Sequence, residues 1–131
     1  MMLLNTPVAA GFPSPARDEG SRPLDLQALL VEHPESTFFW RVEGVSMEGM
    51  GIHHGDLLVV DRSLPPVSGS VVVAILDGGF VVKQFVRRPG EVILRSGHPD
   101  HAEIAIDAER ELSIWGVVRW SLHRLINPTS R

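Results

Sequence analysis

Lys83 is the residue whose type and setting most strongly suggest chemistry. It is the only lysine in a 131-residue chain with eleven arginines, and it lies in the apolar segment 80–86. On an extended strand its side chain would share a face with Val81 and Phe85, which would partly desolvate the ammonium group and lower its pKa. A neutral amine can act as a general base, whereas arginine stays protonated. The alternative is a lysine whose ammonium group reaches solvent at a sheet edge.

Ser46 is the candidate nucleophile. It follows Gly44 at the end of a predicted strand and lies in a glycine-rich turn. A serine at such a junction can present its Oγ beside backbone amides, and the N–H groups of Val45 and Ser46 could stabilise an oxyanion. Most Gly-x-Ser turns are only turns. Together with Lys83, however, Ser46 predicts a Ser-Lys dyad, in which the amine replaces the histidine of a serine-protease triad.

The remaining polar residues indicate no second reactive centre. Adjacent His53 and His54 point apart on an extended segment, and His98 and His101 occupy a predicted loop, so a zinc site would need further ligands. Two aspartates are expected to serve turn and surface roles at the ends of a strand, rather than to form a catalytic pair; they are Asp56 and Asp61. Glycine-rich phosphate-binding motifs are absent, and we predict neither a metal nor another cofactor.

Composition indicates one globular domain with a core that needs no disulfide, because the chain has 131 residues and no cysteine. The net charge of −4 argues against a large phosphate-neutralising surface, so we expect no direct sequence-specific DNA binding. No apolar run reaches the length of about 18 residues that a membrane span needs, and no export signal is evident. We therefore expect a cytoplasmic protein without membrane contact.

The elements that must position these residues are mainly β. Residues 1–23 are rich in proline and glycine and are expected to form a flexible arm without regular structure. A short helix should begin after Asp25 and stop at Pro34, with Leu26, Leu29, Leu30 and His33 on one face. Seven short strands are then predicted, at 38–43, 57–60, 70–76, 80–86, 91–95, 102–106 and 112–120. The residues Asp77-Gly78-Gly79 favour a tight hairpin between the third and fourth.

Two separated motifs resemble the LexA/UmuD-like self-cleaving peptidases. Residues 44–47 and 51–61 are similar to the nucleophile segment of that family and the strand after it. Residues 81–83 resemble its general-base strand, and residues 114–118 its closing strand. The resemblance covers residues 11–122 and implies a fold of short, highly bent antiparallel strands with one short N-terminal helix. It also implies a flexible arm, residues 1–23, and a peptidase and dimerisation domain, residues 24–131.

Within this family the sequence resembles the UmuD branch, whose members are accessory subunits of error-prone translesion DNA polymerases. Only 45 residues precede Ser46, too few for the winged helix-turn-helix of a LexA repressor, and residues 9–16 and 25–34 are similar to UmuD. The resemblance implies that the chain cuts its own Ala10-Gly11 bond when stimulated by a RecA filament on single-stranded DNA during the SOS response. The trimmed homodimer would then join an UmuC-type polymerase. Cleavage within one chain and cleavage between chains both remain open.

Two other functions remain compatible with the sequence. One is a non-catalytic adaptor that keeps the fold and uses the arm only as a docking peptide. The other is a signal-peptidase-like enzyme that cuts other chains, since those enzymes also use serine and lysine. Trp115 and Trp120 in the last predicted strand could supply a dimer surface or simply pack in the core.

Overall fold

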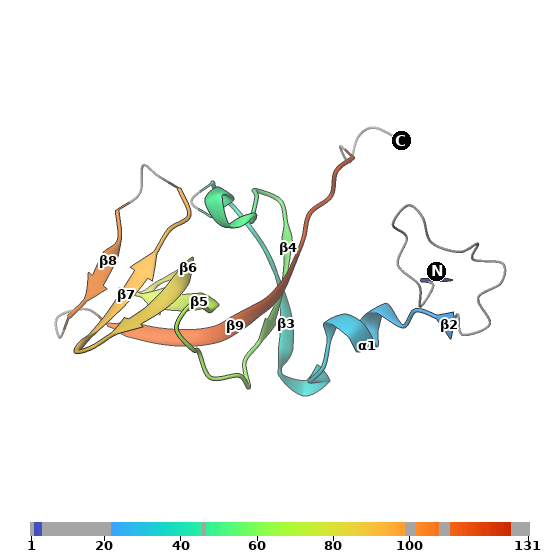
Figure 1. Cartoon of the computed structure of the whole chain (residues 1–131), viewed down its shortest axis with the longest axis horizontal. Helices are drawn as coiled ribbons and strands as arrows, with labels where there is room; N and C mark the ends of the chain where they lie inside the picture. The colour runs from blue at the N-terminus through green and yellow to red at the C-terminus, as the bar shows by residue number, and fades with distance from the viewer. Residues whose placement is uncertain (1, 4–21, 46, 99–101, 108–110, 127–131) are drawn as a thin grey trace. The chain divides into compact units, whose positions relative to one another are not determined.

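The computed structural model describes residues 2–3, 22–45, 47–98, 102–107 and 111–126 (Figure 1). Two compact units divide the chain, Met1–Leu30 and Val31–Arg131. The sheet that carries Lys83 lies entirely in the second unit. That unit therefore contains the candidate site.

Within its described residues, the first unit contains three short elements. Strand β1, Met2–Leu3, pairs antiparallel with β2, Arg22–Pro23. This two-residue pairing differs from the expectation that residues 1–23 contain no ladder. Helix α1, Leu26–Leu30, is capped as predicted, because the Ala28 N–H donates to Asp25 Oδ1 at 3.1 Å.

The helix is shorter than the apolar spacing predicted. His33 has φ −125° and ψ 87°, so it does not belong to the helical face on which the sequence placed it. Helical dihedral angles are disfavoured for a residue that precedes proline, as His33 does here. Pro34 starts the 3₁₀ helix η2, Pro34–Ser36. His33 belongs to the second unit, where it contacts Asp61.

The second unit is built on one seven-stranded antiparallel sheet, which confirms the mainly β fold class. Its strand order is β3-β4-β9-β5-β6-β7-β8. The bounds are β3 Thr37–Arg41, β4 Leu57–Asp61, β5 Val71–Leu76, β6 Gly79–Arg88, β7 Glu91–Arg95, β8 Ile104–Ile106 and β9 Leu112–Leu122. A second 3₁₀ helix, η3 Glu48–Met50, follows the candidate nucleophile.

The hairpin between β5 and β6 forms at the predicted place. Leu76 pairs with Gly79, so the loop contains only Asp77 and Gly78, with φ of 50° and 87°. Two successive positive φ values are the signature of a type I′ turn, whose twist matches that of the flanking strands. This register places Lys83 directly opposite Val72.

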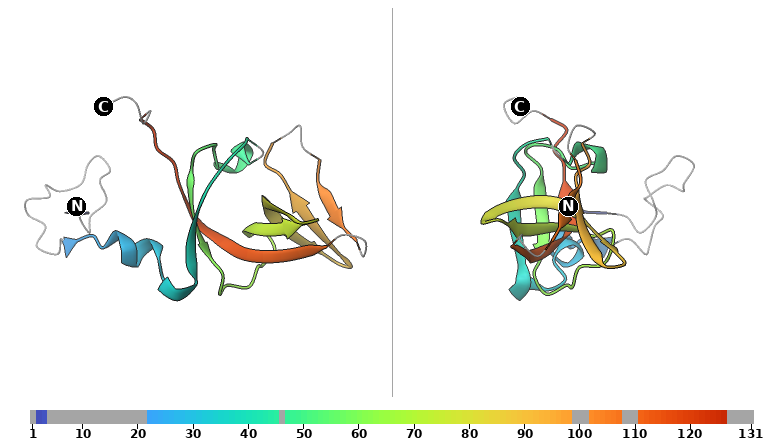
Figure 2. Two further views of the ribbon diagram at one scale, coloured as in Figure 1. Left: turned by 180° about the vertical axis from the view of Figure 1, so that it is seen from behind. Right: turned by 90° about the vertical axis from the view of Figure 1, so that its left-hand side faces the viewer.

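Strand β9 joins the two halves of the sheet. It is strongly curved (Figure 2) and pairs with β4 along one part and β5 along the other. Its ladders shift register between Val59 and Val60 and between Val73 and Ala74. Gly116 lies at this crossing, where an added Cβ would be 2.7 Å from Val60 Cγ1. The absence of a side chain at this position allows the strands to approach closely.

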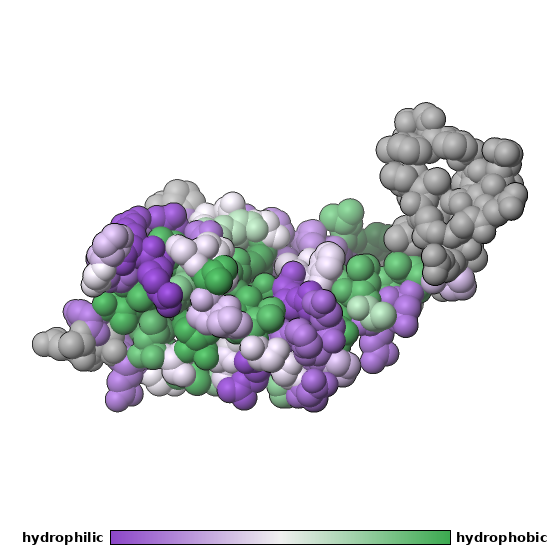
Figure 3. Space-filling model, turned by 60° about the horizontal axis from the view of Figure 1, so that its bottom comes forward, coloured by the Kyte–Doolittle hydropathy of each residue, from purple (hydrophilic) through white to green (hydrophobic). Residues whose placement is uncertain are grey.

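The buried side chains form two apolar clusters within the second unit. One contains Val42, Met47, Ile52, Leu58, Val60 and Val73, and the other contains Val72, Ala74, Phe85, Leu94 and Val117. Trp115 packs against the first cluster, whereas Trp120 is 38% exposed. Apolar and polar areas alternate over the molecular face drawn in Figure 3.

Candidate active site

Ser46 lies outside the described residues, and so do the predicted scissile residues Ala10 and Gly11. The structure does describe the residues on both sides of Ser46 and the whole strand that carries Lys83. The site is therefore built from the segments that hold its two predicted catalytic groups.

A cavity of about 530 Å³ brings these segments together. Gly44 and Met47, which flank the serine position, contribute to its lining, and so does Lys83 from β6. The other lining residues are Trp40, Arg41, Val42, Glu43, Leu58, Val73, Phe80, Val81 and Val82. Met47 and Lys83, 36 positions apart in the sequence, thus border one cleft.

Lys83 is half-buried in apolar surroundings, as the sequence predicted. Its cross-strand partner Val72 is fully buried, and Phe85, two residues along the same face, is 3% exposed. Burial lowers the pKa of Lys83 below its ordinary value. No carboxylate among the described residues forms an ion pair with its ammonium group. The lysine is therefore a cation without a compensating charge in this part of the chain.

The segment that leads to Ser46 is held by the residues that precede β4. The Val42 N–H donates to Asp56 O at 2.9 Å, and the Gly55 N–H donates to Val42 O at 2.9 Å. The next bond uses a side chain, because the Gly44 N–H donates to His54 Nδ1 at 3.0 Å. Gly44 has φ 93°, a conformation that disfavours residues with a Cβ.

The segment that follows Ser46 is held by Met47. Its side chain is 2% exposed in the first apolar cluster, and its carbonyl oxygen accepts from the N–H groups of Met50 and Ile52 at 3.0 and 3.2 Å. Val45, one of the two predicted oxyanion donors, is 45% exposed, and its carbonyl accepts from the Glu48 N–H at 3.2 Å. Both neighbours of Ser46 thus take part in the hydrogen bonds of one compact loop.

The loop after β7 supports this segment from another direction. A Cβ on Gly49 would lie 1.8 Å from Gly97 O, and one on Gly97 would lie 2.8 Å from Met50 N. The two backbones therefore touch at positions where only glycine fits. This contact fixes the place of η3, which directly follows Met47.

Comparison with known proteins relates this chain to a family. Residues 3–119 match the family described as peptidase S24-like. The chain belongs to the peptidase S24-like family. Protein MucA of Salmonella typhimurium is 45% identical over 116 residues, which are 88% of this chain and 79% of MucA. Protein ImpA of Shigella flexneri is 41% identical over 115 residues, or 88% of this chain and 78% of ImpA.

The LexA repressor of Ectopseudomonas mendocina is also similar to this S24-like chain. It is 36% identical over 104 residues, which are 79% of this chain but only 50% of the repressor. The predicted resemblance to the LexA/UmuD-like peptidases is thus confirmed, and the chain is a UmuD-like member of that family.

Two aspartates at the ends of β4 correct the sequence analysis of this S24-like chain. Asp56 and Asp61 were expected in turn and surface roles, but they are 1% and 0% exposed. Their turn role is confirmed, because Asp56 accepts from the His53 N–H and Asp61 from the Ser63 N–H, both at 2.8 Å. Their surface role was wrong. Their position at the two ends of a wholly apolar strand was the sequence signal that could have predicted their burial.

Asp56 ties the end of β9 to the segment that precedes β4 and holds the turn before position 46. It accepts from Ser121 Oγ at 3.1 Å and from His123 Nδ1 at 2.6 Å, besides the His53 N–H. Burial alone would raise the pKa of Asp56, but the hydrogen bonds from these three residues outweigh burial and lower it. The buried carboxylate is therefore stable in its charged form.

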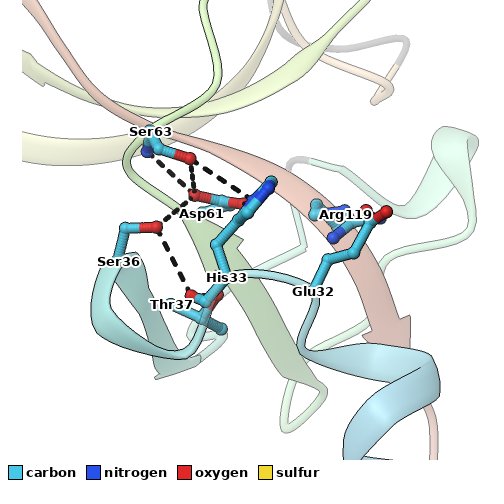
Figure 4. Close-up of polar contacts among 7 residues, drawn as sticks. All are labelled: Glu32, His33, Ser36, Thr37, Asp61, Ser63 and Arg119. Atoms are coloured by element: carbon cyan, nitrogen blue, oxygen red, sulfur yellow. Dashed lines mark hydrogen bonds and ion pairs between the residues drawn. The ribbon is translucent and has the colours of Figure 1, made fainter.

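Asp61 forms a similar network at the other end of β4 (Figure 4). It accepts from His33 Nδ1 at 2.5 Å, Ser36 Oγ at 2.8 Å and Ser63 Oγ at 2.7 Å. Ser63 Oγ also lies 3.4 Å from His33 Nδ1, the same ring nitrogen that contacts Asp61. A catalytic triad needs the serine on the opposite nitrogen, so this Asp-His-Ser group is structural. It fixes the start of β3.

The histidines do not gather into a metal centre in the part of the chain that is described. His53 and His54 make separate contacts, because the His53 ring lies 4.7 Å from the His123 ring and His54 contacts Gly44. His101 lies outside the described residues. Over the described ranges, no three His, Asp or Glu residues are grouped to hold a metal ion, and no helix is long and apolar enough to cross a membrane.

Proposed function

We propose that this chain is a self-cleaving serine peptidase in which Ser46 is the nucleophile and Lys83 the general base. The observation that carries the proposal is the shared cleft, which is lined both by the residues that flank Ser46 and by Lys83. Desolvation of Lys83 without a paired carboxylate favours the neutral amine that the reaction needs. Membership of the peptidase S24-like family supports the same chemistry.

The reaction proceeds in two stages. Neutral Lys83 Nζ takes the proton of Ser46 Oγ as Oγ bonds to the carbonyl carbon of Ala10, and the N–H groups of Val45 and Ser46 stabilise the oxyanion. The carbon–nitrogen bond to Gly11 then breaks, and the leaving nitrogen takes the proton from Lys83. In the second stage, Lys83 removes a proton from water, the resulting hydroxide attacks the acyl group, and Ser46 Oγ leaves and is reprotonated.

The edge of β6 supports an extended substrate. Strand β7 pairs only with Gln84–Arg88 of β6, so within the described residues the stretch 79–83 has a strand partner on one side only. An extended peptide can add to such an edge through main-chain hydrogen bonds. We assign the arm, residues 1–23, as this peptide, because the small residues Ala10 and Gly11 suit a narrow cleft. The linker from Gly11 to Phe38 would span about 90 Å if fully extended, and α1 and η2 shorten this reach. The proposal includes cleavage within one chain and cleavage between chains.

The biological role proposed is that of a UmuD-like accessory subunit in SOS mutagenesis. A RecA filament on single-stranded DNA would promote docking of the arm in the cleft, as a shift between pre-existing conformations. The domain of residues 24–131 would form a cytoplasmic homodimer and join an UmuC-type polymerase. Similarity to MucA and ImpA supports this branch of the family, and the exposed Trp120 offers apolar surface for a protein contact.

Mass spectrometry of the purified full chain tests the proposal. Incubation at alkaline pH, or with an activated RecA filament, should remove residues 1–10 from the wild type. Ser46→Ala, Lys83→Ala and Lys83→Arg should all remain intact, the last because arginine keeps the charge but cannot act as a base.

The same experiment separates the alternatives. A chain that stays intact under every condition while it still dimerises would favour the non-catalytic adaptor. Multiple turnover of unrelated peptides would favour a signal-peptidase-like enzyme. Cleavage at Ala10-Gly11 that persists in Lys83→Ala would rule out the proposed dyad.

A further inference from the structure

The turn before the serine position is held by a histidine side chain that the proposed reaction does not use. Two backbone hydrogen bonds join residue 42 to residues 55 and 56, and the next bond toward Ser46 ends on His54 Nδ1 instead of a carbonyl oxygen. Gly44, the donor, is two residues before Ser46 and has φ 93°. The position of the imidazole ring thus sets where the paired backbone ends and the nucleophile loop begins.

This contact requires one protonation state of the ring. A backbone N–H can only donate, so Nδ1 must carry a free lone pair and the proton of the neutral ring must reside on Nε2. Protonation of Nδ1 would replace the acceptor with a second donor that faces the Gly44 N–H. Because His54 and Gly44 are both exposed, solvent protons have direct access to this bond.

The charged groups around His54 come from both strands of the turn. Arg41 Nη1 donates to Gly55 O at 2.9 Å, and Glu43 directly precedes Gly44. On its own segment, His54 follows His53, which lies 3.8 Å from Glu48 and whose N–H donates to Asp56. The positively charged Arg41 and the negatively charged Glu43 thus flank the turn. The Asp56 carboxylate instead accepts hydrogen bonds from His53, Ser121 and His123.

We propose that His54 is a positioning residue for Ser46, and that its neutral ring, through Nδ1, holds the nucleophile loop in the conformation that cleaves. The inference rests on the proposed self-cleavage and adds a second requirement to it. Lys83 must be neutral to accept a proton, and His54 must be neutral to place the loop that presents Ser46. Protonation of the His54 ring would then slow cleavage beyond the decline caused by protonation of Lys83.

Two substitutions of His54 separate positioning from general stability. His54→Ala removes the acceptor and should slow cleavage by roughly 5- to 10-fold at alkaline pH, the effect of one lost hydrogen bond in the loop. His54→Asn carries Oδ1 in place of Nδ1 and does not titrate, so it should cleave within about 2-fold of wild type at alkaline pH. It should also lack the additional acid-side decline. His53→Ala, which removes the neighbouring ring but leaves the Gly44 acceptor, should retain that decline.

A measurement that needs no cleavage tests the same contact. In the full-length Ser46→Ala chain, nuclear magnetic resonance should show the His54 ring with its proton on Nε2 at alkaline pH. The Gly44 amide should exchange slowly there and faster once the ring is protonated. In Ser46→Ala/His54→Ala, Gly44 should exchange fast at every pH after correction for intrinsic exchange.

The outcomes distinguish failure of this inference from failure of the proposed function. If the wild type cleaves but His54→Ala matches it over the whole pH range, His54 has no positioning role. If His54→Asn cleaves as poorly as His54→Ala, the acceptor is not what matters and the inference is wrong. If the wild type never cleaves, the proposed function fails. If hydrogen exchange of the Gly44 amide does not respond to protonation or removal of the His54 ring, the contact between them is wrong whatever the cleavage assay shows.

Discussion

Asp61 and Lys83 are both ionisable side chains set among apolar strands, and in both the pKa is lowered, but the causes are opposite. Burial alone would raise the pKa of Asp61, and hydrogen bonds from His33, Ser63 and Ser36 overcome it. For Lys83 burial is the cause of the shift. A lowered pKa means a stabilised charge on an acid and a destabilised charge on a base. The first arrangement strengthens the fold, whereas the second provides a group that gives up its proton easily.

The largest expected effect comes from removing the lysine. Lys83→Met should reduce self-cleavage by at least about 10³-fold, because the general base is lost. The same substitution should raise the free energy of unfolding at pH 7, since an uncompensated, partly desolvated charge disappears. Cleavage by mass spectrometry and urea unfolding measure the two effects. Lys83→Arg, the charged control, should lose cleavage without becoming more stable, and rapid cleavage by that variant would contradict the assignment.

Removing the buried carboxylate should have the opposite effect on the fold. Asp61→Asn should lower the free energy of unfolding by about 2–4 kcal/mol, because an amide cannot accept all the hydrogen bonds that the carboxylate accepts. Glu91→Gln is a matched carboxylate-to-amide control, because Glu91 is exposed at the start of β7. Urea unfolding at pH 7 should show little change for the control. Equal stability of the two variants would mean that the Asp61 network contributes little.

A glycine in η3, just after the Ser46 position, tests whether self-cleavage needs a fixed loop around that serine. Gly49→Ala should slow cleavage and reduce stability by about 1–3 kcal/mol, because its Cβ would lie 1.8 Å from Gly97 O and the backbone must move. Gly79→Ala, where the nearest atom is 3.8 Å away, should change both much less. Cleavage assays and thermal unfolding of the two variants give the comparison. Normal cleavage by Gly49→Ala would show that the close backbone contact is dispensable.

Acid titration should separate the stabilised charge from the destabilised one. The pKa of Asp61 is lowered, so its contribution is fully present above the ordinary aspartate value of about 3.9 and is lost as pH falls toward the lowered value. The lowered pKa of Lys83 instead makes stability rise as pH increases toward about 10.4, because the unfolded chain holds the proton longer. The free energy of unfolding, measured with urea across pH, should fall in acid and rise toward alkaline pH. Asp61→Asn should reduce the fall in acid, and Lys83→Met should remove the alkaline rise.

The smallest effect should come from His33, the partner of Asp61. Its hydrogen bond with Asp61 raises the pKa of His33, so its contribution is fully present below the ordinary histidine value of about 6.5 and is lost as pH rises through the raised value. The thermal stability of the wild type should therefore fall slightly between mildly acidic and alkaline pH, and His33→Gln should not show this fall. Its effect should largely vanish in the Asp61→Asn background. An unchanged pH dependence in His33→Gln would show that the ring is not titrating against Asp61.

Local sequence patterns predicted most of the fold. Alternating apolar residues and turn residues located all seven strands of the large sheet, and Asp77-Gly78 located the hairpin, because each signal is contained within a few neighbouring residues. The pairing of β1 with β2 and the early end of α1 were not predicted. The pairing of β1 with β2 joins residues beyond a local window. The early end of α1 follows from Pro34, which disfavours helical dihedral angles at His33, but the apolar spacing extended the predicted helical face to that residue.

The burial of Asp56 and Asp61 could not be derived from such signals. Ser121 and His123, which bond to Asp56, lie 65 and 67 positions later in the sequence. The contact between Gly49 and Gly97 likewise joins loops far apart in the chain. In the sequence these glycines read only as turn residues, and His54 as an unremarkable neighbour of His53.

The sequence by itself determined the chemical groups available to this protein: one lysine within an apolar strand, a serine in a glycine-rich turn, and strands of the right length to hold them. Only the tertiary structure decided that Lys83 has no carboxylate partner among the described residues, that Asp61 has several hydrogen-bond donors, and that the residues flanking Ser46 border the same cleft as Lys83. The physical reason is that desolvation and hydrogen bonding act over a few ångströms of space, and in this sheet the nearest neighbours come from strands that are distant along the chain.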